Sequence, residues 1–228
     1  MTFFRKKRVF ALLLIGFILI LFMNSTFIGR KLYPIYFEQE IRQSAAKHDI
    51  DPFLIAAIIR VETNYQYHLE SHKGAIGLMQ LMPDTAAWIV ETANLGTLTQ
   101  EDLRNAAINI NLGAWYLNWL THHYNGNLVY AIAAYNAGQG NVNKWKSNAI
   151  WDGTVEQISQ IPFGETRHYV QRVLYYYDKY KKLYTESWQG QARTSLINKE
   201  VLDLLLNGER SPILLVHRNL RAAHQVFT

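Results

Sequence analysis

A single glutamate, Glu62, ends an otherwise apolar stretch and is well placed for acid–base chemistry. The nine residues before it read Phe-Leu-Ile-Ala-Ala-Ile-Ile-Arg-Val. Burial disfavours the charged form of a carboxyl, so a glutamate held by such a helix keeps its proton to higher pH than a solvated one. A general acid that works near neutral pH needs this property. The alternative is a glutamate that turns to the surface or pairs with Arg60.

The elements around Glu62 are predicted to be helical. Asp51 and Pro52 suit the cap and first position of a helix that carries Glu62 near its end. Gly138 follows a long apolar run and is predicted to stop a second buried helix. Further helical patterns begin near residues 35 and 83, Asp102 is expected to cap a long helix, and a last helix is expected from Glu165 to Tyr184. Only the glycine-containing stretch 71–81 favours a small hairpin. The predicted fold class is mainly α.

Composition excludes several kinds of function. The formal net charge is +5, and four of those charges come from the basic run 5–8, so the remaining chain is nearly neutral and no nucleic-acid surface is expected. There is no cysteine, which removes disulfides, thiolate chemistry and cysteine metal ligands. His68 and His72 are four apart but have no third ligand in the sequence pattern, so no metal site and no cofactor are predicted.

The N-terminus carries a membrane signal. Residues 1–8 are basic, and residues 9–28 are almost entirely apolar and, as a helix, long enough to cross a hydrocarbon core of roughly 30 Å. The basic flank predicts a cytoplasmic N-terminus and an extracytoplasmic domain, that is, a single-pass protein of the cell membrane. A cleaved signal peptide is the alternative, but no small-residue cleavage site follows the run.

Four sequence motifs together resemble the soluble lytic transglycosylase family, whose catalytic domain is goose-lysozyme-like. They are Arg-Val-Glu-Thr-Asn-Tyr from residue 60, Ser-His-Lys-Gly-Ala-Ile-Gly-Leu-Met-Gln-Leu-Met-Pro-Asp-Thr-Ala from 71, Ala-Ala-Tyr-Asn-Ala-Gly-Gln-Gly-Asn-Val from 133 and Ile-Pro-Phe-Gly-Glu-Thr-Arg-His-Tyr-Val from 161. The resemblance covers about residues 34–186. It implies an α+β lysozyme-like domain there, after a tether at 29–33 and before a C-terminal tail, 187–228, of unassigned role.

The resemblance also implies roles for individual residues. Glu62 matches the catalytic acid of the family. Positions that match the sugar-binding groove are Ser71, Met79, Gln80, Tyr135, Asn136, Glu165 and Tyr169. Taken without the family, Met79 is equally well explained as a core residue. A tyrosine on an apolar helix, such as Tyr135, is usually a core residue with a satisfied hydroxyl, so its role in the groove rests on the resemblance. One departure is Thr63, where many members have serine.

The implied reaction is cleavage of peptidoglycan glycan strands without water and without a cofactor or metal. Glu62 would protonate the oxygen that links N-acetylmuramic acid to N-acetylglucosamine, and the sugar's own C6 hydroxyl would then attack C1 to give a 1,6-anhydromuramyl end. Ordinary glycoside hydrolysis uses two carboxyls, so a muramidase with Glu70 or another acid as base is one alternative. A membrane-anchored, non-catalytic glycan-binding scaffold is the other.

Overall fold

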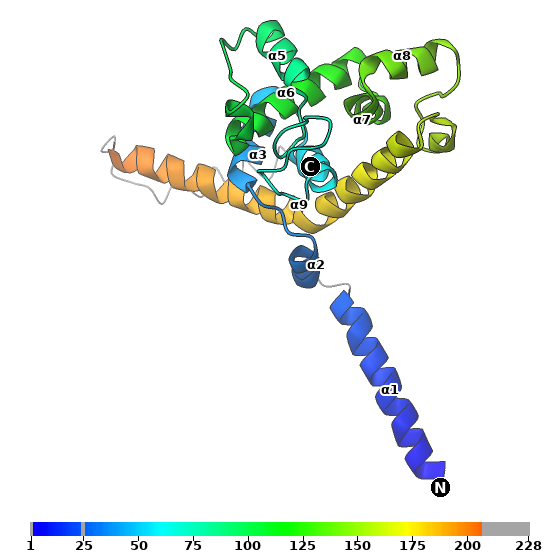
Figure 1. Ribbon diagram of the computed structural model, residues 1–228. Helices are drawn as coiled ribbons and strands as arrows, with labels where there is room; N and C mark the ends of the chain where they lie inside the picture. Colours follow the sequence, from blue (N-terminus) through cyan, green and yellow to red (C-terminus); the bar gives the residue numbers. More distant parts are fainter. Residues whose placement is uncertain (1, 24–25, 207–228) are drawn as a thin grey trace. The chain divides into compact units, whose positions relative to one another are not determined.

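The computed structural model describes residues 2–23 and 26–206, and this part of the chain is mainly helical, as predicted (Figure 1). The α-helices are α1 (Thr2–Met23), α2 (Thr26–Leu32), α3 (Glu38–His48), α4 (Pro52–Glu62), α5 (Pro83–Thr92), α6 (Ala106–His123), α7 (Leu128–Ala137), α8 (Gln139–Ser147) and α9 (Gly164–Leu206). Two short 3₁₀ turns are η1 (Asp102–Arg104) and η2 (Ile158–Gln160). The chain divides into two compact units, Met1–Leu183 and Tyr184–Thr228.

Helix α4 is the buried core of the first unit. Every residue from 53 to 59 is buried, and Leu54 and Ile55 are at most 1% exposed. Each such aliphatic side chain contributes about 1.5–3 kcal/mol through burial. The predicted start is confirmed: the Asp51 carboxylate accepts the Phe53 N–H at 2.8 Å, and Pro52 occupies the first turn. This apolar helix delivers Glu62 to its C-terminal end.

The other helices pack around α4 and α6. Helices α3, α5 and α7 all contact α6, which is the long green helix across the middle of the domain in Figure 1. The predicted helix over residues 128–137 is confirmed as α7, with Asn127 as its cap and Gly138 at its end. Gly138 has a φ of 80°, which other residues rarely adopt, so it ends α7 and lets α8 begin at once.

Residues 63–82 form an irregular segment between α4 and α5. The predicted hairpin over 71–81 is reduced to two isolated antiparallel bridges, Glu70 with Ile76 and Ile76 with Leu81. The turns are too tight for strands to extend, because Gly74 and Gly77 both have positive φ. The segment is nonetheless held firmly, since Ile76, Leu78 and Met79 are completely buried.

Two predicted helix boundaries differ in the structure. Asp102 was expected to cap the long helix, but its carboxylate accepts hydrogen bonds from the backbone and hydroxyl of Thr99, both at 2.7 Å, and so opens the turn η1. Asn105 caps α6 instead, accepting the Ile108 N–H at 3.2 Å. Helix α9 continues beyond its expected end at Tyr184 to Leu206, because neither glycine nor proline interrupts it before Gly190 and that glycine is tolerated.

The N-terminal segment contains two helices rather than the single one predicted over 9–28. Helix α1 ends at Met23 and α2 begins at Thr26, with residues 24 and 25 outside the described part. Among the residues that the structure describes, none of the helices meets the length and hydropathy required of a membrane span. Membrane anchoring stays a prediction, as do the domain limits 29–33, 34–186 and 187–228. Within the predicted tail, residues 207–228 lie outside the described part.

Candidate active site

Glu62 is the last residue of α4, and its carboxylate meets the first turns of α9. The Tyr169 hydroxyl donates a hydrogen bond to Glu62 Oε1 at 2.7 Å. Tyr169 is buried, and Glu62 retains some exposure at the end of its helix. Because α9 is far from α4 in the sequence, this contact exists only in the folded domain. It fixes one oxygen of the Glu62 carboxylate.

The surroundings of Glu62 shift its protonation toward neutral pH. Its pKa is raised from 4.5 to about 7, mainly by burial, and the hydrogen bond from Tyr169 and the positive charge of Arg172 keep the rise from being larger. The negative charge of Glu165 adds to it. At pH 7 the carboxyl is therefore about half protonated, so it can both give and take a proton. This environment agrees with the prediction that Glu62 keeps its proton to higher pH than a solvated glutamate.

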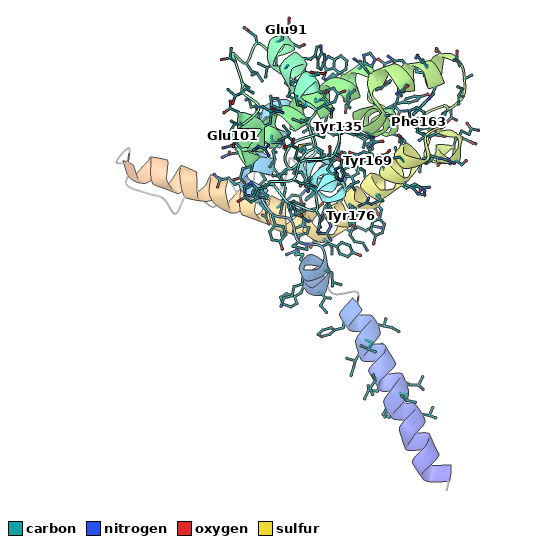
Figure 2. All side chains as sticks on the ribbon, in the orientation of Figure 1. Glu91, Glu101, Tyr135, Phe163, Tyr169 and Tyr176 are labelled. Carbon is teal, nitrogen blue, oxygen red and sulfur yellow. The ribbon has the colours of Figure 1, made fainter. Side chains whose placement is uncertain are left out.

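Tyr135 brings a second phenol to the same place from α7. Its hydroxyl donates to the Met79 carbonyl oxygen at 2.8 Å. Burial is the main reason that the pKa values of Tyr135 and Tyr169 are raised well above 10, and the charge of Glu62 raises both further. Both phenols are therefore neutral hydrogen-bond donors. Figure 2 shows them near one another in the middle of the helical domain.

Asn136 and Thr166 join the two helices that carry these tyrosines. The Thr166 hydroxyl donates to Asn136 Oδ1 at 2.8 Å, across the junction of α7 and α9. Thr166 is almost completely buried. The bond therefore sets the spacing of Tyr135 and Tyr169 from within the protein. Glu165, one residue earlier, is exposed on the first turn of α9.

The other predicted groove residues have structural contacts within the segment 63–82. The Ser71 hydroxyl accepts the Ala75 N–H at 2.9 Å, which closes a tight turn. The Gln80 amide donates to the carbonyls of Leu69 at 3.0 Å and Gly77 at 2.9 Å. Both side chains keep some exposure, whereas Met79 is completely buried. The structure therefore places Glu62, Tyr135 and Tyr169 together, and gives Ser71, Met79 and Gln80 contacts that shape the segment.

Asn109, which the sequence analysis did not single out, holds this segment in place. It lies fully buried on α6 and donates to the carbonyls of Ile76 and Leu103, both at 2.9 Å. Its carbonyl oxygen accepts the Met79 N–H at 2.8 Å. The close approach needs Gly77, because a Cβ there would overlap the Asn109 amide. The sequence did offer a sign of this role, because Asn109 stands within the apolar pattern of residues 106–120. Buried asparagines are uncommon, and their polar groups are nearly always hydrogen-bonded.

Thr63 ties the acid itself to the segment. It is buried, and its hydroxyl lies 2.9 Å from the Leu78 carbonyl oxygen and 3.2 Å from the Ile59 carbonyl oxygen. The residue after Glu62 thus acts as a brace between the end of α4 and residues 76–81. Serine would keep the hydroxyl, so the departure from the family pattern conserves this contact.

Arg172 was also missed by sequence reasoning. It lies three residues after Tyr169, a spacing that places both on one face of α9. Its charge lowers the pKa of Glu62, and it is exposed. The charge of Arg172 therefore favours the carboxylate form of Glu62, which is the form that remains after proton transfer. Within the part of the chain that the structure describes, no three metal-ligating side chains gather at one point.

Comparison with known proteins finds a matching family model and several related sequences. The family model described as Transglycosylase SLT domain matches residues 39–158. The soluble lytic murein transglycosylase of Escherichia coli K12 is 33% identical over 148 residues, which cover 63% of this chain and 23% of that protein. Membrane-bound lytic murein transglycosylase C of Salmonella typhi is 32% identical over 154 residues, covering 58% and 43% respectively. The chain therefore spans about a quarter of its soluble relatives' length.

Solved structures show the same fold. The 70 kDa soluble lytic transglycosylase of Escherichia coli has a TM-score of 0.64 and 32% identity, over 68% of this chain and 25% of that one. An inactive mutant of the lytic transglycosylase Slt from Pseudomonas aeruginosa has a TM-score of 0.60 and 36% identity, over 66% and 25%. The family model alone spans more than half of the chain. On the evidence of its matched motifs, helical fold and buried Glu62, this chain belongs to the SLT transglycosylase domain family.

Proposed function

We propose that this chain is a lytic transglycosylase that cleaves the β-1,4 bond between N-acetylmuramic acid and N-acetylglucosamine in peptidoglycan. The observation that carries the proposal is Glu62, whose pKa of about 7 suits a residue that acts first as an acid and then as a base. Membership of the SLT transglycosylase domain family supports the same substrate.

In the first step Glu62 transfers its proton to the glycosidic oxygen. The bond from C1 of the muramyl sugar to that oxygen breaks, and N-acetylglucosamine leaves with a new hydroxyl. Positive charge develops at C1, and the N-acetyl group of the muramyl sugar stabilises it, as in other substrate-assisted glycosidases. Arg172 supports the Glu62 carboxylate that results, since its charge favours the ionised form.

In the second step the Glu62 carboxylate takes the proton of the muramyl C6 hydroxyl, and that oxygen forms a bond to C1. The product is a 1,6-anhydromuramyl end, and Glu62 has regained its proton. No water, metal or cofactor enters the balance. An attack from within the same sugar gains from proximity, because no second molecule has to be brought into place.

We propose that the neighbouring residues position the glycan for these steps. Tyr169 orients the Glu62 carboxyl through its 2.7 Å hydrogen bond. Tyr135, Asn136 and Glu165 line the groove beside it. Ser71, Met79 and Gln80 act through the segment 71–81, whose shape their contacts maintain.

A hydrolytic muramidase is the second candidate, and it needs another carboxyl as base. Glu70 is poorly suited, because it pairs with Arg104 at 2.6 Å. Glu165 is the other acid to consider as the base, because its negative charge raises the pKa of Glu62. A pure glycan-binding scaffold has no need of a buried acid with a raised pKa, so we favour the enzyme.

Replacement of Glu62 by Gln tests the reaction. We expect purified peptidoglycan treated with the native chain to release muropeptides with 1,6-anhydromuramic acid, detected by mass spectrometry, and Glu62→Gln to release none. Glu156→Gln, which changes an exposed acid just before η2, should behave as the native chain. Products one water heavier would establish a muramidase instead, and lysis by Glu62→Gln would refute the assignment.

The pH profile tests the role of Tyr169. Loss of kcat/KM at high pH should have its midpoint near 7, since Glu62 must be protonated to act. Tyr169→Phe removes a hydrogen bond that favours the carboxylate, so the pKa of Glu62 rises and the midpoint moves to higher pH. Tyr175→Phe, on another part of α9, should leave the midpoint unchanged. A midpoint that stays or moves down in Tyr169→Phe would contradict this role.

The raised pKa also makes stability depend on pH. Between pH 4.5 and about 7 the folded chain keeps a proton that the unfolded chain releases, so the free energy of unfolding falls as the pH rises through this window. The glutamine of Glu62→Gln cannot ionise. The free energy of unfolding of this variant, relative to that of the native chain, should therefore grow by about 3 kcal/mol from pH 4.5 to pH 8. Urea unfolding measures this difference between the variant and the native chain. The same difference at pH 4.5 and at pH 8 would mean that Glu62 is solvated.

We further propose that residues 34–186 form the catalytic domain and that residues 9–28 attach it to the cytoplasmic membrane, with the basic residues 1–8 in the cytoplasm. Support comes from the apolar side chains of α1, many of which are more than half exposed, among them Phe10, Leu13 and Phe22. The hydrocarbon core of a bilayer would cover them. Residues 29–33 would tether the domain on the peptidoglycan side.

Cell fractionation tests the attachment. The full chain is expected in the membrane fraction and to stay there in high salt, since apolar contacts resist salt. Removal of residues 1–28 should shift the chain to the soluble fraction. Recovery of the full chain in the soluble fraction would refute the proposal.

A further inference from the structure

The residues proposed as a tether, 29–33, pack on α9. Arg30 Nε donates a hydrogen bond to the Leu183 carbonyl oxygen at 2.8 Å, across 153 positions of sequence. Gly29 lies against the same leucine, because a Cβ at that position would overlap the Leu183 side chain. The first end of the segment is therefore fixed to α9 by a hydrogen bond and by close packing.

Tyr33 fixes the other end of the segment. Its hydroxyl lies 3.0 Å from the Tyr175 hydroxyl, and its ring meets those of Tyr175 and Tyr176 edge to face, with centroids 6.5 Å and 6.2 Å away. The ammonium group of Lys179 lies over the Tyr33 ring, 5.3 Å from its centroid. The contacts with Tyr175 and Leu183 are about 12 Å apart along α9, so the segment follows the helix over about two turns and in the opposite direction.

The same stretch of α9 is tied to the helix that carries Glu62. The Tyr177 hydroxyl donates to Asp51 Oδ2 at 2.8 Å, and the Lys181 ammonium lies 3.8 Å from the same oxygen. Asp51 caps α4, which ends at Glu62. Tyr169, which donates to Glu62, precedes Tyr177 by about 12 Å of helix. Segment 29–33 is thus joined through α9 to the candidate active site, within one compact unit.

The two sides of α2 differ in what they contact. The helical spacing that directs Gly29 and Arg30 toward α9 places Phe27, Lys31 and Leu32 on the opposite side. Phe27 is 66% exposed and Leu32 is 64% exposed. The Lys31 ammonium lies 5.0 Å from the centroid of the Phe27 ring. Large apolar side chains that stay exposed on a helix whose other side is packed indicate a surface that another molecule covers.

Positive charge is concentrated around this contact. Residues 26–33 and 175–183 together contain five basic side chains and one acid, Asp178. Asp51 and Arg60, which both contact this stretch of α9, cancel one another. The chain after the basic run 5–8 carries only one net positive charge in all, so the rest of it is net negative. The partner that fits this surface is therefore anionic.

The position of α2 in the chain selects a lipid surface as that partner. Only residues 24 and 25 separate α2 from α1, and two residues span at most about 7 Å. The exposed apolar side chains of α1 are those that we propose to enter the membrane. Basic groups are attracted to anionic headgroups, and tyrosine and lysine suit the boundary between headgroups and acyl chains. A lipid surface thus fits the charge, the exposed apolar groups and the place in the chain together.

We propose that an interfacial face of this domain lies on the anionic headgroups of the membrane that holds α1, and that the docked segment 29–33 keeps Glu62 at a set height above that membrane. The face consists of exposed side chains of α2 and α9: Phe27, Lys31, Leu32, Tyr175 and Lys182. The chain then reaches the glycan strands nearest the membrane and not those further out. This inference rests on the proposed membrane attachment, since it takes the same bilayer as partner.

Fluorescence quenching tests the position of α9. The chain has no cysteine, so a single introduced cysteine carries the only fluorophore. The full chain is placed in vesicles of anionic lipid at low salt, and some headgroups carry a quencher. We expect the label of Lys182→Cys to lose most of its emission. The label of Glu91→Cys should keep its emission, because Glu91 is exposed at the opposite end of the domain from Tyr176 (Figure 2).

Variants of the docked segment and of the face test the cause. Tyr33→Ala removes the contacts with α9, so emission from the label at position 182 should recover, whereas Tyr67→Ala, at another exposed tyrosine, should change nothing. Lys31 is exposed, so its replacement leaves the fold intact. Lys31→Glu should also restore emission, and Lys144→Glu, at an exposed lysine of α8, should not.

The outcomes separate this inference from the proposed attachment, which flotation of the vesicles in high salt measures. If the chain floats but the labels at positions 182 and 91 are quenched alike, the attachment stands and the inference is overturned. Quenching at position 182 that is unchanged when neutral lipid replaces the anionic lipid overturns it too. If the chain floats only at low salt and position 182 is still quenched, the face binds lipid and only the attachment through α1 is wrong.

Discussion

The hydrogen bond between Tyr169 and Glu62 is the contact on which the rest of the candidate site depends. A carboxyl at the end of a buried helix loses hydration, and a donor with good geometry recovers part of that loss. The 2.7 Å bond from Tyr169 does so without adding charge. The pKa of Glu62 therefore stays near 7 instead of rising further, and the carboxyl can both donate and accept a proton.

The irregular segment between α4 and α5 shows how much of the protein maintains the shape of the site. Asn109 bonds three backbone groups from inside the core, and Thr63 braces the segment from the opposite side. Gly77 permits the close approach that Asn109 needs. Buried polar side chains stabilise a fold when every one of their polar groups is hydrogen-bonded. Asn109 and Thr63 in this way hold a segment that has no regular strands. A backbone fixed in this way can present the same surface each time a ligand binds.

Two kinds of aromatic side chain serve this domain. Tyr135 and Tyr169 are enclosed, so their phenols stay neutral and act as donors at fixed positions. The rings of Trp88, Trp115 and Trp119 on α5 and α6 remain partly exposed to solvent. Tyr116 lies between the two groups.

The sequence by itself determined the local elements and the place of Glu62 in them. Asp51 and Pro52 start α4, Gly138 ends α7, and an apolar run places Glu62 at the end of a buried helix, because capping and periodicity are local properties. The tertiary structure alone decided the partners. Tyr169 meets Glu62 across 107 positions of sequence, and Asn109 reaches Met79 across 30. Such contacts depend on how helices pack, and no local pattern encodes that.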